Sequence, residues 1–224
     1  VTVRDELRRV TADPTPVAGA ATPPPFGIRT RDVWGARAPL STSYASTVKL
    51  AVVHHSDSGN SYGPGDVPGI LRSIQAFHMD GRGWSDIAYN FVVDKFGTVW
   101  EGRGGGIDRP VIGAHAMGFN TGSVGVMVIG DYTQATPTAA ALESASSVIG
   151  WKMAQHLADP AGTVAFTSGG STKYPAGQLT LEPGQVAEFM SYFGLGESES
   201  NRALRQELVW EALIGAAAQS GTEL

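Results

Sequence analysis

Two nearly uninterrupted apolar runs constrain the fold of this chain more than any other feature. They lie at Val48 to His55, which contains LAVVHH, and at Ser123 to Ile129, which reads SVGVMVI. Strands that are buried on both faces have this pattern, and they are typical of parallel sheets covered by helices. Because helical patterns follow each run, we predict an α/β protein with a mixed, largely parallel central sheet flanked by helices in a single domain.

Two stretches of the chain have the periodicity of helices. The first begins at Asp66, which we expect to cap it, and has Pro68 in its first turn, where proline is favourable. The second opens at Thr136-Pro137 and runs to about Leu157. One face of the first helix is predicted to carry Ile70, Leu71, Ile74, Phe77 and His78.

Four shorter segments have the composition of strands. Asn90 to Asp94 and Thr98 to Gly102 flank the turn Lys95-Phe96-Gly97, which predicts a hairpin. Val164 to Thr167 and Gln178 to Leu181 are predicted to form two further short strands.

The composition divides the chain into three parts. Residues 1–26 are rich in Thr, Ala and Pro and are expected to form a flexible lead-in. Residues 27–182 have the composition of a folded domain. Residues 183–224 form a divergent segment, in which Glu199 to Ala218 is predicted to be a helix.

Charge, hydropathy and cysteine content exclude several classes of function. The net charge is −5 and no basic run exceeds two residues, so we expect no nucleic-acid partner. We also expect no transmembrane segment, since no apolar stretch approaches the roughly 20 residues that a membrane helix needs. The chain has no cysteine, so thiolate metal ligands and disulfides are not available to it.

Two adjacent histidines end the first strand. Consecutive strand residues point to opposite faces, so His54 and His55 cannot both bind one ion while the strand stays regular. They lie at the carboxyl end of a buried strand, where α/β sheets commonly bind ligands. The alternative is that both only satisfy local hydrogen bonds at a strand terminus.

Three extended motifs accompany these histidines. They are RTRDVWGAR from Arg29, WSDIAYNFVVDKFGTVWEGR from Trp84 and VIGAHAMGFNTGSVGVMVIGDY from Val111. In this order and spacing, the chain resembles the peptidoglycan-recognition proteins and the related zinc-dependent N-acetylmuramoyl-L-alanine amidases. The resemblance covers Arg29 to Leu181, and the insertion Thr167 to Gly177 is similar to one found in secreted bacterial members.

The resemblance implies a role for each matching residue. His54 corresponds to a zinc ligand, and Tyr89 to the residue that assists the metal-bound water and the developing oxyanion. His115 and Asn120 correspond to residues of the groove that contact the muramyl-peptide stem. Three neighbouring residues, His55, Trp84 and Phe119, are also expected to bind substrate, whereas Arg103 is expected to anchor the sheet edge.

The sequence departs from the family pattern after Leu181. The family carries a segment of the form G-H-R-D-x-x-x-T-x-C-P-G there, whose His and Cys complete the zinc site. Here the chain continues EPGQVAEFMSYFGLGESES, which contains neither residue. His115 is the alternative second ligand, and Glu182, Glu188 or Asp57 could supply a carboxylate. His78 and His156 lie on apolar helix faces, where core histidines are expected.

Three hypotheses therefore remain open from the sequence. The first is a zinc-dependent amidase that cleaves the bond between N-acetylmuramic acid and L-alanine. The second is a peptidoglycan-binding domain that keeps the groove but has lost two of three zinc ligands. The third is a truncated, non-functional or partner-dependent product. Peptidoglycan or muramyl peptides are the expected partners, and this substrate, not a signal peptide, implies an extracellular or cell-wall location.

Overall fold

The central feature of the fold is a five-stranded sheet. The computed structural model describes residues 23–156, 164–168 and 177–181. The strands of the sheet are β1 (Ile28–Arg29), β2 (Leu50–His55), β3 (Phe91–Val93), β4 (Val99–Glu101) and β5 (Ser123–Val128). Their order across the sheet is β1-β4-β3-β5-β2. All neighbouring strands pair in parallel except β3 and β4, so the predicted mixed, largely parallel sheet is confirmed.

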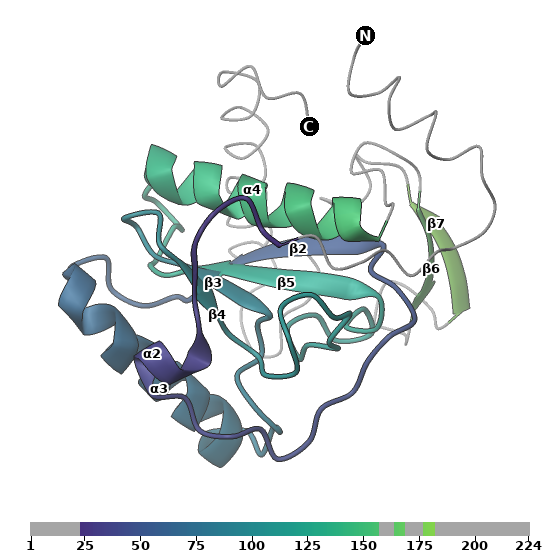
Figure 1. Ribbon diagram of the computed structural model, residues 1–224, viewed down its shortest axis with the longest axis horizontal. Helices are drawn as coiled ribbons and strands as arrows, with labels where there is room; N and C mark the ends of the chain where they lie inside the picture. The colour runs from purple at the N-terminus through teal and green to yellow at the C-terminus, as the bar shows by residue number, and fades with distance from the viewer. Residues whose placement is uncertain (1–22, 157–163, 169–176, 182–224) are drawn as a thin grey trace, which may run out of the picture.

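Helices cover both faces of this sheet (Figure 1). The helix α4 (Ala139–Gln155) packs on one face, where Val126 and Val128 of β5 join a core with Val148 and Ile149 of α4. The short α2 (Arg31–Trp34) and α3 (Val67–Ala76) pack on the other face. Both faces of β5 are therefore buried, which explains its uninterrupted apolar sequence.

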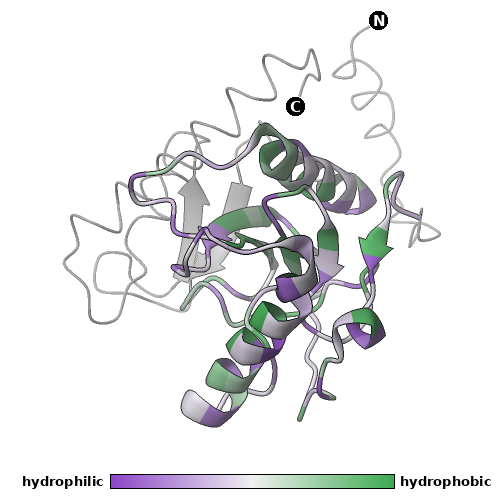
Figure 2. Ribbon diagram, turned by 90° about the vertical axis from the view of Figure 1, so that its left-hand side faces the viewer, coloured by the Kyte–Doolittle hydropathy of each residue, from purple (hydrophilic) through white to green (hydrophobic). Residues whose placement is uncertain are grey.

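The side chains of β2 divide between the two faces. Val53 belongs to the core under α4, whereas Val52 belongs to the core under α2 and α3. His54 and His55 follow this alternation and so lie on different faces. In Figure 2 the helices carry both apolar (green) and polar (purple) residues, as expected of helices that bury one side.

The first predicted helix begins as expected, with Asp66 at the N-cap position of α3 and Pro68 in its first turn. The Asp66 carboxylate makes no cap bond to α3; it accepts the backbone N–H of Gly63 at 2.7 Å and closes the preceding 3₁₀ turn, Pro64–Asp66. At the other end, the chain continues as a π-helical turn, η2 (Phe77–Gly81). Phe77 was predicted on the apolar face but is 55% exposed, and its ring packs against the guanidinium of Arg82, 5.2 Å from the ring centroid.

The remaining predicted elements are present where the structure describes them. The hairpin of β3 and β4 has Phe91 opposite Glu101. Its turn is held by the buried carboxylate of Asp94, which accepts the backbone N–H groups of Phe96 and Thr98 at 2.9 and 3.0 Å. The two short strands are β6 (Val164–Ser168) and β7 (Gly177–Leu181), which pair antiparallel.

Several predictions concern residues outside the described part of the chain. The lead-in 1–26 is described only from residue 23, and the predicted helix Glu199 to Ala218 lies outside the described residues. Most of the insertion Thr167 to Gly177 lies outside them too. Among the described helices, none is long and apolar enough to cross a bilayer.

Candidate functional site

Two histidines that are far apart in the sequence meet on the face of the sheet that α2 and α3 cover. The Nε2 atom of His54, on β2, lies 3.1 Å from Nδ1 of His115, which belongs to the loop before β5. Their rings are 5.2 Å apart and inclined at 69°. At this distance the two nitrogens share one hydrogen bond, so the two histidines form a directly coupled pair.

Tyr89 lies beside this pair. Its ring is centred 5.3 Å from that of His54. The backbone of Tyr89 is held by the segment that follows β4, because its carbonyl accepts the N–H of Arg103 at 2.8 Å. Gly102 permits this approach, since a Cβ atom there would lie 2.4 Å from the Tyr89 carbonyl oxygen. The segment just after β4 therefore fixes the backbone of Tyr89 beside His54.

The imidazole of His115 rests directly on the backbone of the sheet. A Cβ atom at Gly125 of β5 would lie 2.4 Å from Cδ2 of His115, and one at Gly113 would lie equally close. Burial, and to a smaller extent the charge of Arg103, lowers the pKa of His115 to about 3. The ring is therefore neutral at physiological pH.

His54 and His55 lie at the carboxyl end of β2, where the sequence predicted them. The rest of the cluster is not confined to strand ends, because Tyr89 precedes β3 and His115 packs against the first half of β5. The site therefore extends over the face of the sheet. It can do so because Gly125 leaves the space that a side chain would otherwise fill.

The loop that carries His115 is held by Asn120. The side-chain oxygen of Asn120 accepts the backbone N–H groups of His115 and Ala116 at 2.8 and 2.9 Å. Phe119 is fully buried beneath the loop, whereas Met117 is 56% exposed at its tip. In this conformation Asn120 and Phe119 shape the loop, and neither the buried ring of Phe119 nor the bonded oxygen of Asn120 offers a free contact surface.

Trp84 reaches the site through His78, which the sequence assigned to the core. His78 is 6% exposed, and its ring stacks on Trp84 with centroids 5.0 Å apart. The same ring lies 5.8 Å from that of Tyr89. Burial lowers the pKa of His78 to about 4, and its Nδ1 accepts the backbone N–H of Ala88 at 3.2 Å. His78 is thus both a core residue and a wall of the site.

His55 points away from this cluster. Its Nδ1 accepts the backbone N–H of Tyr132 at 3.2 Å, on the α4 face, and lies 3.9 Å from a carboxylate oxygen of Asp131. Within the described residues, His55, Asp57 and Asp131 have ligand atoms within 4.8 Å of one another. Asp131 also stabilises this loop, because its carboxylate accepts both the backbone N–H and the hydroxyl of Thr133.

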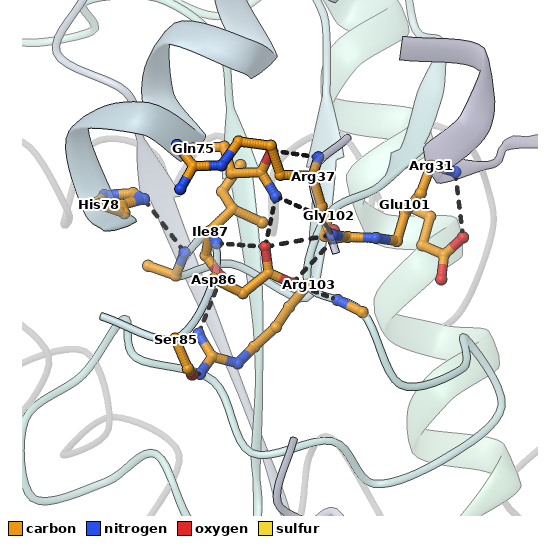
Figure 3. A network of polar contacts seen from close by, with 12 residues as sticks. Arg31, Arg37, Gln75, His78, Ser85, Asp86, Ile87, Glu101, Gly102 and Arg103 are labelled. Atoms are coloured by element: carbon orange, nitrogen blue, oxygen red, sulfur yellow. Dashed lines mark hydrogen bonds and ion pairs between the residues drawn. The ribbon is translucent and has the colours of Figure 1, made fainter. Parts of the chain in front are cut away.

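A buried carboxylate holds the segment that leads from Trp84 to Tyr89 (Figure 3). Asp86 has no exposed surface and accepts the side-chain amide of Gln75 at 2.7 Å. It also accepts the backbone N–H of Gly104 at 2.8 Å and forms an ion pair with Arg31 at 3.0 Å. This single carboxylate therefore ties α2, α3 and the end of β4 to the site.

Arg103 completes the support of this segment. Its guanidinium donates to the carbonyl of Ile87 at 3.0 Å and to the hydroxyl of Ser85 at 2.6 Å. Both acceptors belong to the stretch between Trp84 and Tyr89. Arg103 therefore anchors this segment and not a sheet edge, because the neighbouring strand β4 lies between β1 and β3.

Comparison with known proteins identifies the family. The family model described as N-acetylmuramoyl-L-alanine amidase matches residues 44–184. The chain belongs to this family. This amidase-family chain is also 38% identical over 123 residues to peptidoglycan-recognition protein SC2 of Drosophila simulans, covering 54% of this chain and 65% of that protein. It is 34% identical over 155 residues to peptidoglycan-recognition protein LB of Drosophila melanogaster, covering 68% of this chain and 65% of that protein.

Solved structures agree with the family assignment. Drosophila PGRP-LB superimposes with a TM-score of 0.55 at 34% identity, over 60% of this chain and 78% of that one. The chain spans about 65% of the length of the curated relatives SC2 and LB.

The residues around His54 fit a catalytic zinc ion incompletely. Such an ion takes three protein ligands and keeps one open position. The described residues beside His54 offer one further nitrogen at short range, Nδ1 of His115, and a phenol. The carboxylates of Asp57 and Asp131 lie with His55 on the other side of the strand. The described part of this amidase-family chain therefore supplies at most two of the three nitrogen, sulfur or carboxylate ligands.

The structure thus brings together some of the residues predicted from the sequence and separates others. His54, Tyr89 and His115 form one cluster, and Trp84 adjoins it. His55 lies apart from it. His78 is the residue that sequence reasoning missed. Helical periodicity placed His78 on the buried face, where it lies, but no sequence signal marked it as a neighbour of Tyr89.

Proposed function

We propose that this chain recognises peptidoglycan by binding muramyl peptides at the cluster of His54, Tyr89 and His115. The observation that carries the proposal is the meeting of these three side chains, drawn from segments far apart in the sequence, in a chain of the amidase family. Its relatives are named peptidoglycan-recognition proteins. Three of the similar solved structures are complexes with tracheal cytotoxin, described as monomeric diaminopimelic acid-type peptidoglycan.

The chemistry of the cluster supports such a ligand. Muramyl peptides combine apolar sugar faces with amide and hydroxyl groups. Partly exposed rings of Trp84 and Tyr89 offer flat apolar surfaces, and His54 offers a polar group that is neither fully buried nor fully exposed. A site with apolar walls and a few placed polar groups is the usual form of a small-molecule site. The same substrate supports an extracellular or cell-wall location.

Zinc-dependent hydrolysis of the bond between N-acetylmuramic acid and L-alanine is the second candidate. The placement of Tyr89 beside His54 favours it, because a phenol near the reacting carbonyl could stabilise an oxyanion. A bound zinc ion would polarise that carbonyl and lower the pKa of bound water to about 7. The incomplete ligand set around His54 favours binding without hydrolysis.

Adjacent histidines on opposite faces of β2 provide a matched test of the binding site. We expect His54→Gln to weaken the affinity for a muramyl pentapeptide at least about 5-fold, the effect of losing one hydrogen bond of about 1 kcal/mol. His55→Gln should weaken it much less, because His55 lies on the α4 face. Isothermal titration of both variants and the wild type measures this difference. Equal losses of affinity in the two variants would contradict a ligand confined to the His54 face of β2. They would support the sequence-based assignment of His55 to substrate binding.

A second assay separates the two candidate functions. The purified chain is incubated with insoluble peptidoglycan, with added zinc and then with a chelator, and both bound protein and released stem peptides are measured. We expect bound protein without release. Release that the chelator abolishes would establish the amidase, and the lack of bound protein together with no release would refute both candidates.

A further inference from the structure

We infer that Ser123 sets the proton position in the His54–His115 pair, so that His115 orients His54 through a hydrogen bond and is not a second metal ligand. The inference deepens the proposed function, because it concerns the same site. It rests on the contacts of three side chains and on the number of protons that each can donate.

The first step concerns the hydroxyl of Ser123, which is 2% exposed at the start of β5. Its oxygen lies 2.5 Å from the carbonyl oxygen of Phe119, 3.3 Å from that of Asn120 and 3.5 Å from Nε2 of His115. A carbonyl oxygen can only accept, and a serine has a single hydroxyl proton. The short contact therefore takes that proton to Phe119. Ser123 then presents only lone pairs to His115.

The second step concerns the ring of His115. A neutral imidazole carries one proton, on either Nδ1 or Nε2. Because Ser123 can only accept from it, the proton is favoured on Nε2, which leaves a lone pair on Nδ1. That lone pair faces Nε2 of His54 at 3.1 Å. Two lone pairs at this distance would repel, so His54 carries its own proton on Nε2 and donates it.

The third step concerns the orientation of the ring. The ring of His115 lies against Gly113 and Gly125, and its backbone N–H is held by Asn120. In this position Nδ1 of His115 faces His54 and Nε2 faces Ser123. The direction of the hydrogen bonds then runs from His54 to His115 to Ser123 to the Phe119 carbonyl.

This direction has a consequence for any cation at the site. A metal ion binds imidazole only at a lone pair, and a ligating histidine commonly donates its other N–H to a fixed acceptor. While the pair is hydrogen-bonded, His54 has its lone pair on Nδ1 and His115 is such an acceptor. His115 is therefore a positioning residue for His54, and with the proton on Nε2 of His54 the two facing nitrogens do not both present lone pairs to one ion.

The test is a measurement of tautomers by NMR of the chain labelled with ¹⁵N in its five histidines. At pH 8, above the ordinary imidazole pKa of about 6.5, the rings are neutral. Signals are assigned with single His→Gln variants. We expect both His54 and His115 to be protonated on Nε2. Protonation of either ring on Nδ1 in the wild type would overturn the inference.

Variants of Ser123 test whether it sets the proton position on His115. Ser123→Ala should reduce the ratio of Nε2–H to Nδ1–H forms of His115 roughly 5-fold, the factor equivalent to losing one hydrogen bond of about 1 kcal/mol. Ser123→Thr keeps the hydroxyl and should restore the wild-type ratio. Ser73→Ala removes an exposed hydroxyl that bonds only within α3, and it should change nothing. An unchanged ratio in a folded Ser123→Ala variant would refute the inference.

Titration of the wild type with zinc chloride distinguishes the two roles of His115. If zinc binds at His54, we expect the Nδ1 signal of His54 to shift while the Nε2 protons of His54 and His115 persist. The same two protons should persist if no zinc binds. Loss of the proton from Nε2 of His54, with a shift of Nδ1 of His115, would make both of them ligands and overturn the inference. These readouts need no peptidoglycan, so failure of the proposed function would leave them interpretable.

Discussion

At the scale of single residues, the site depends on positions without side chains. Gly113 and Gly125 make room for the ring of His115, and Gly102 lets the backbone of Tyr89 approach β4. Motif resemblance named His54, Tyr89 and His115 in advance, since these residues stand in recognisable contexts. The resemblance gave no reason for a glycine at position 125. The reason is structural, because the imidazole of His115, from a distant loop, lies against Gly125.

The role of Gly125 leads to the first prediction. Gly125→Ala should displace the His115 ring, because the new Cβ atom would lie 2.4 Å from it. We expect the free energy of unfolding to fall by about 1–3 kcal/mol, the usual cost of overpacking, and muramyl-peptide affinity to fall with it. Chemical denaturation and isothermal titration measure the two effects.

Gly150→Ala is the matched control. Gly150 is exposed in α4, and a Cβ atom there meets nothing within 4 Å. A helical Gly→Ala change should raise the free energy of unfolding by about 0.4–1 kcal/mol and leave binding unchanged. If Gly125→Ala behaved like Gly150→Ala, the described packing of His115 would be wrong.

At the scale of elements, the sequence predicted the strands well because their signals are local. Uninterrupted apolar runs marked β2 and β5, and a short turn ending in Gly97 marked the hairpin. The end of α3 could not be predicted in this way. The N–H of Arg82 bonds to the carbonyl of Phe77 at 3.0 Å, an i→i+5 contact that breaks the 3.6-residue period. His78 lies within this turn and stacks on Trp84.

The second prediction concerns the carboxylate that connects the elements. Asp86→Asn should lower the free energy of unfolding by about 3 kcal/mol, because it leaves the partly buried Arg31 without its counter-charge and places an amide donor against other donors. Asp80→Asn is the control, since Asp80 forms an exposed ion pair with Arg37 and should change stability little. Similar effects of the two substitutions in urea denaturation would contradict the role given to Asp86.

At the scale of the whole molecule, alternation of strand and helix signals was sufficient to predict an α/β domain. The two faces of the sheet also followed from strand geometry, since Val52 and Val53 enter different cores. Local sequence patterns could not predict which residues, distant in the chain, lie in contact. His55, Asp57 and Asp131 meet because the end of β5 lies beside that of β2, and no local pattern reports this contact.

The third prediction is a pH dependence of global stability. Because burial lowers the pKa of His78 to about 4, from an ordinary value of 6.5, the unfolded chain binds a proton in this interval that the folded chain does not. The stabilisation is therefore complete above pH 6.5 and decreases as the pH falls from 6.5 to 4. One histidine contributes at most about 1.4 kcal/mol per pH unit.

His78→Gln should reduce this slope. The free energy of unfolding is measured by denaturant titration at intervals between pH 4 and 8, for the variant and the wild type. Between pH 7 and 8, His78 should contribute no slope to the free energy of unfolding of the wild type, so this interval serves as an internal reference. Equal slopes below pH 6.5 would contradict the burial of a neutral His78.

The binding site is tested most directly by finding where a muramyl pentapeptide binds. Backbone amide NMR of the ¹⁵N-labelled chain, recorded during titration with the peptide, reports the contact face. We expect the shifted signals to gather at His54, Tyr89 and the loop of His115, with those of Tyr132 and α4 unmoved. Shifts confined to the α4 face, or no shifts at a saturating concentration of the peptide, would contradict it.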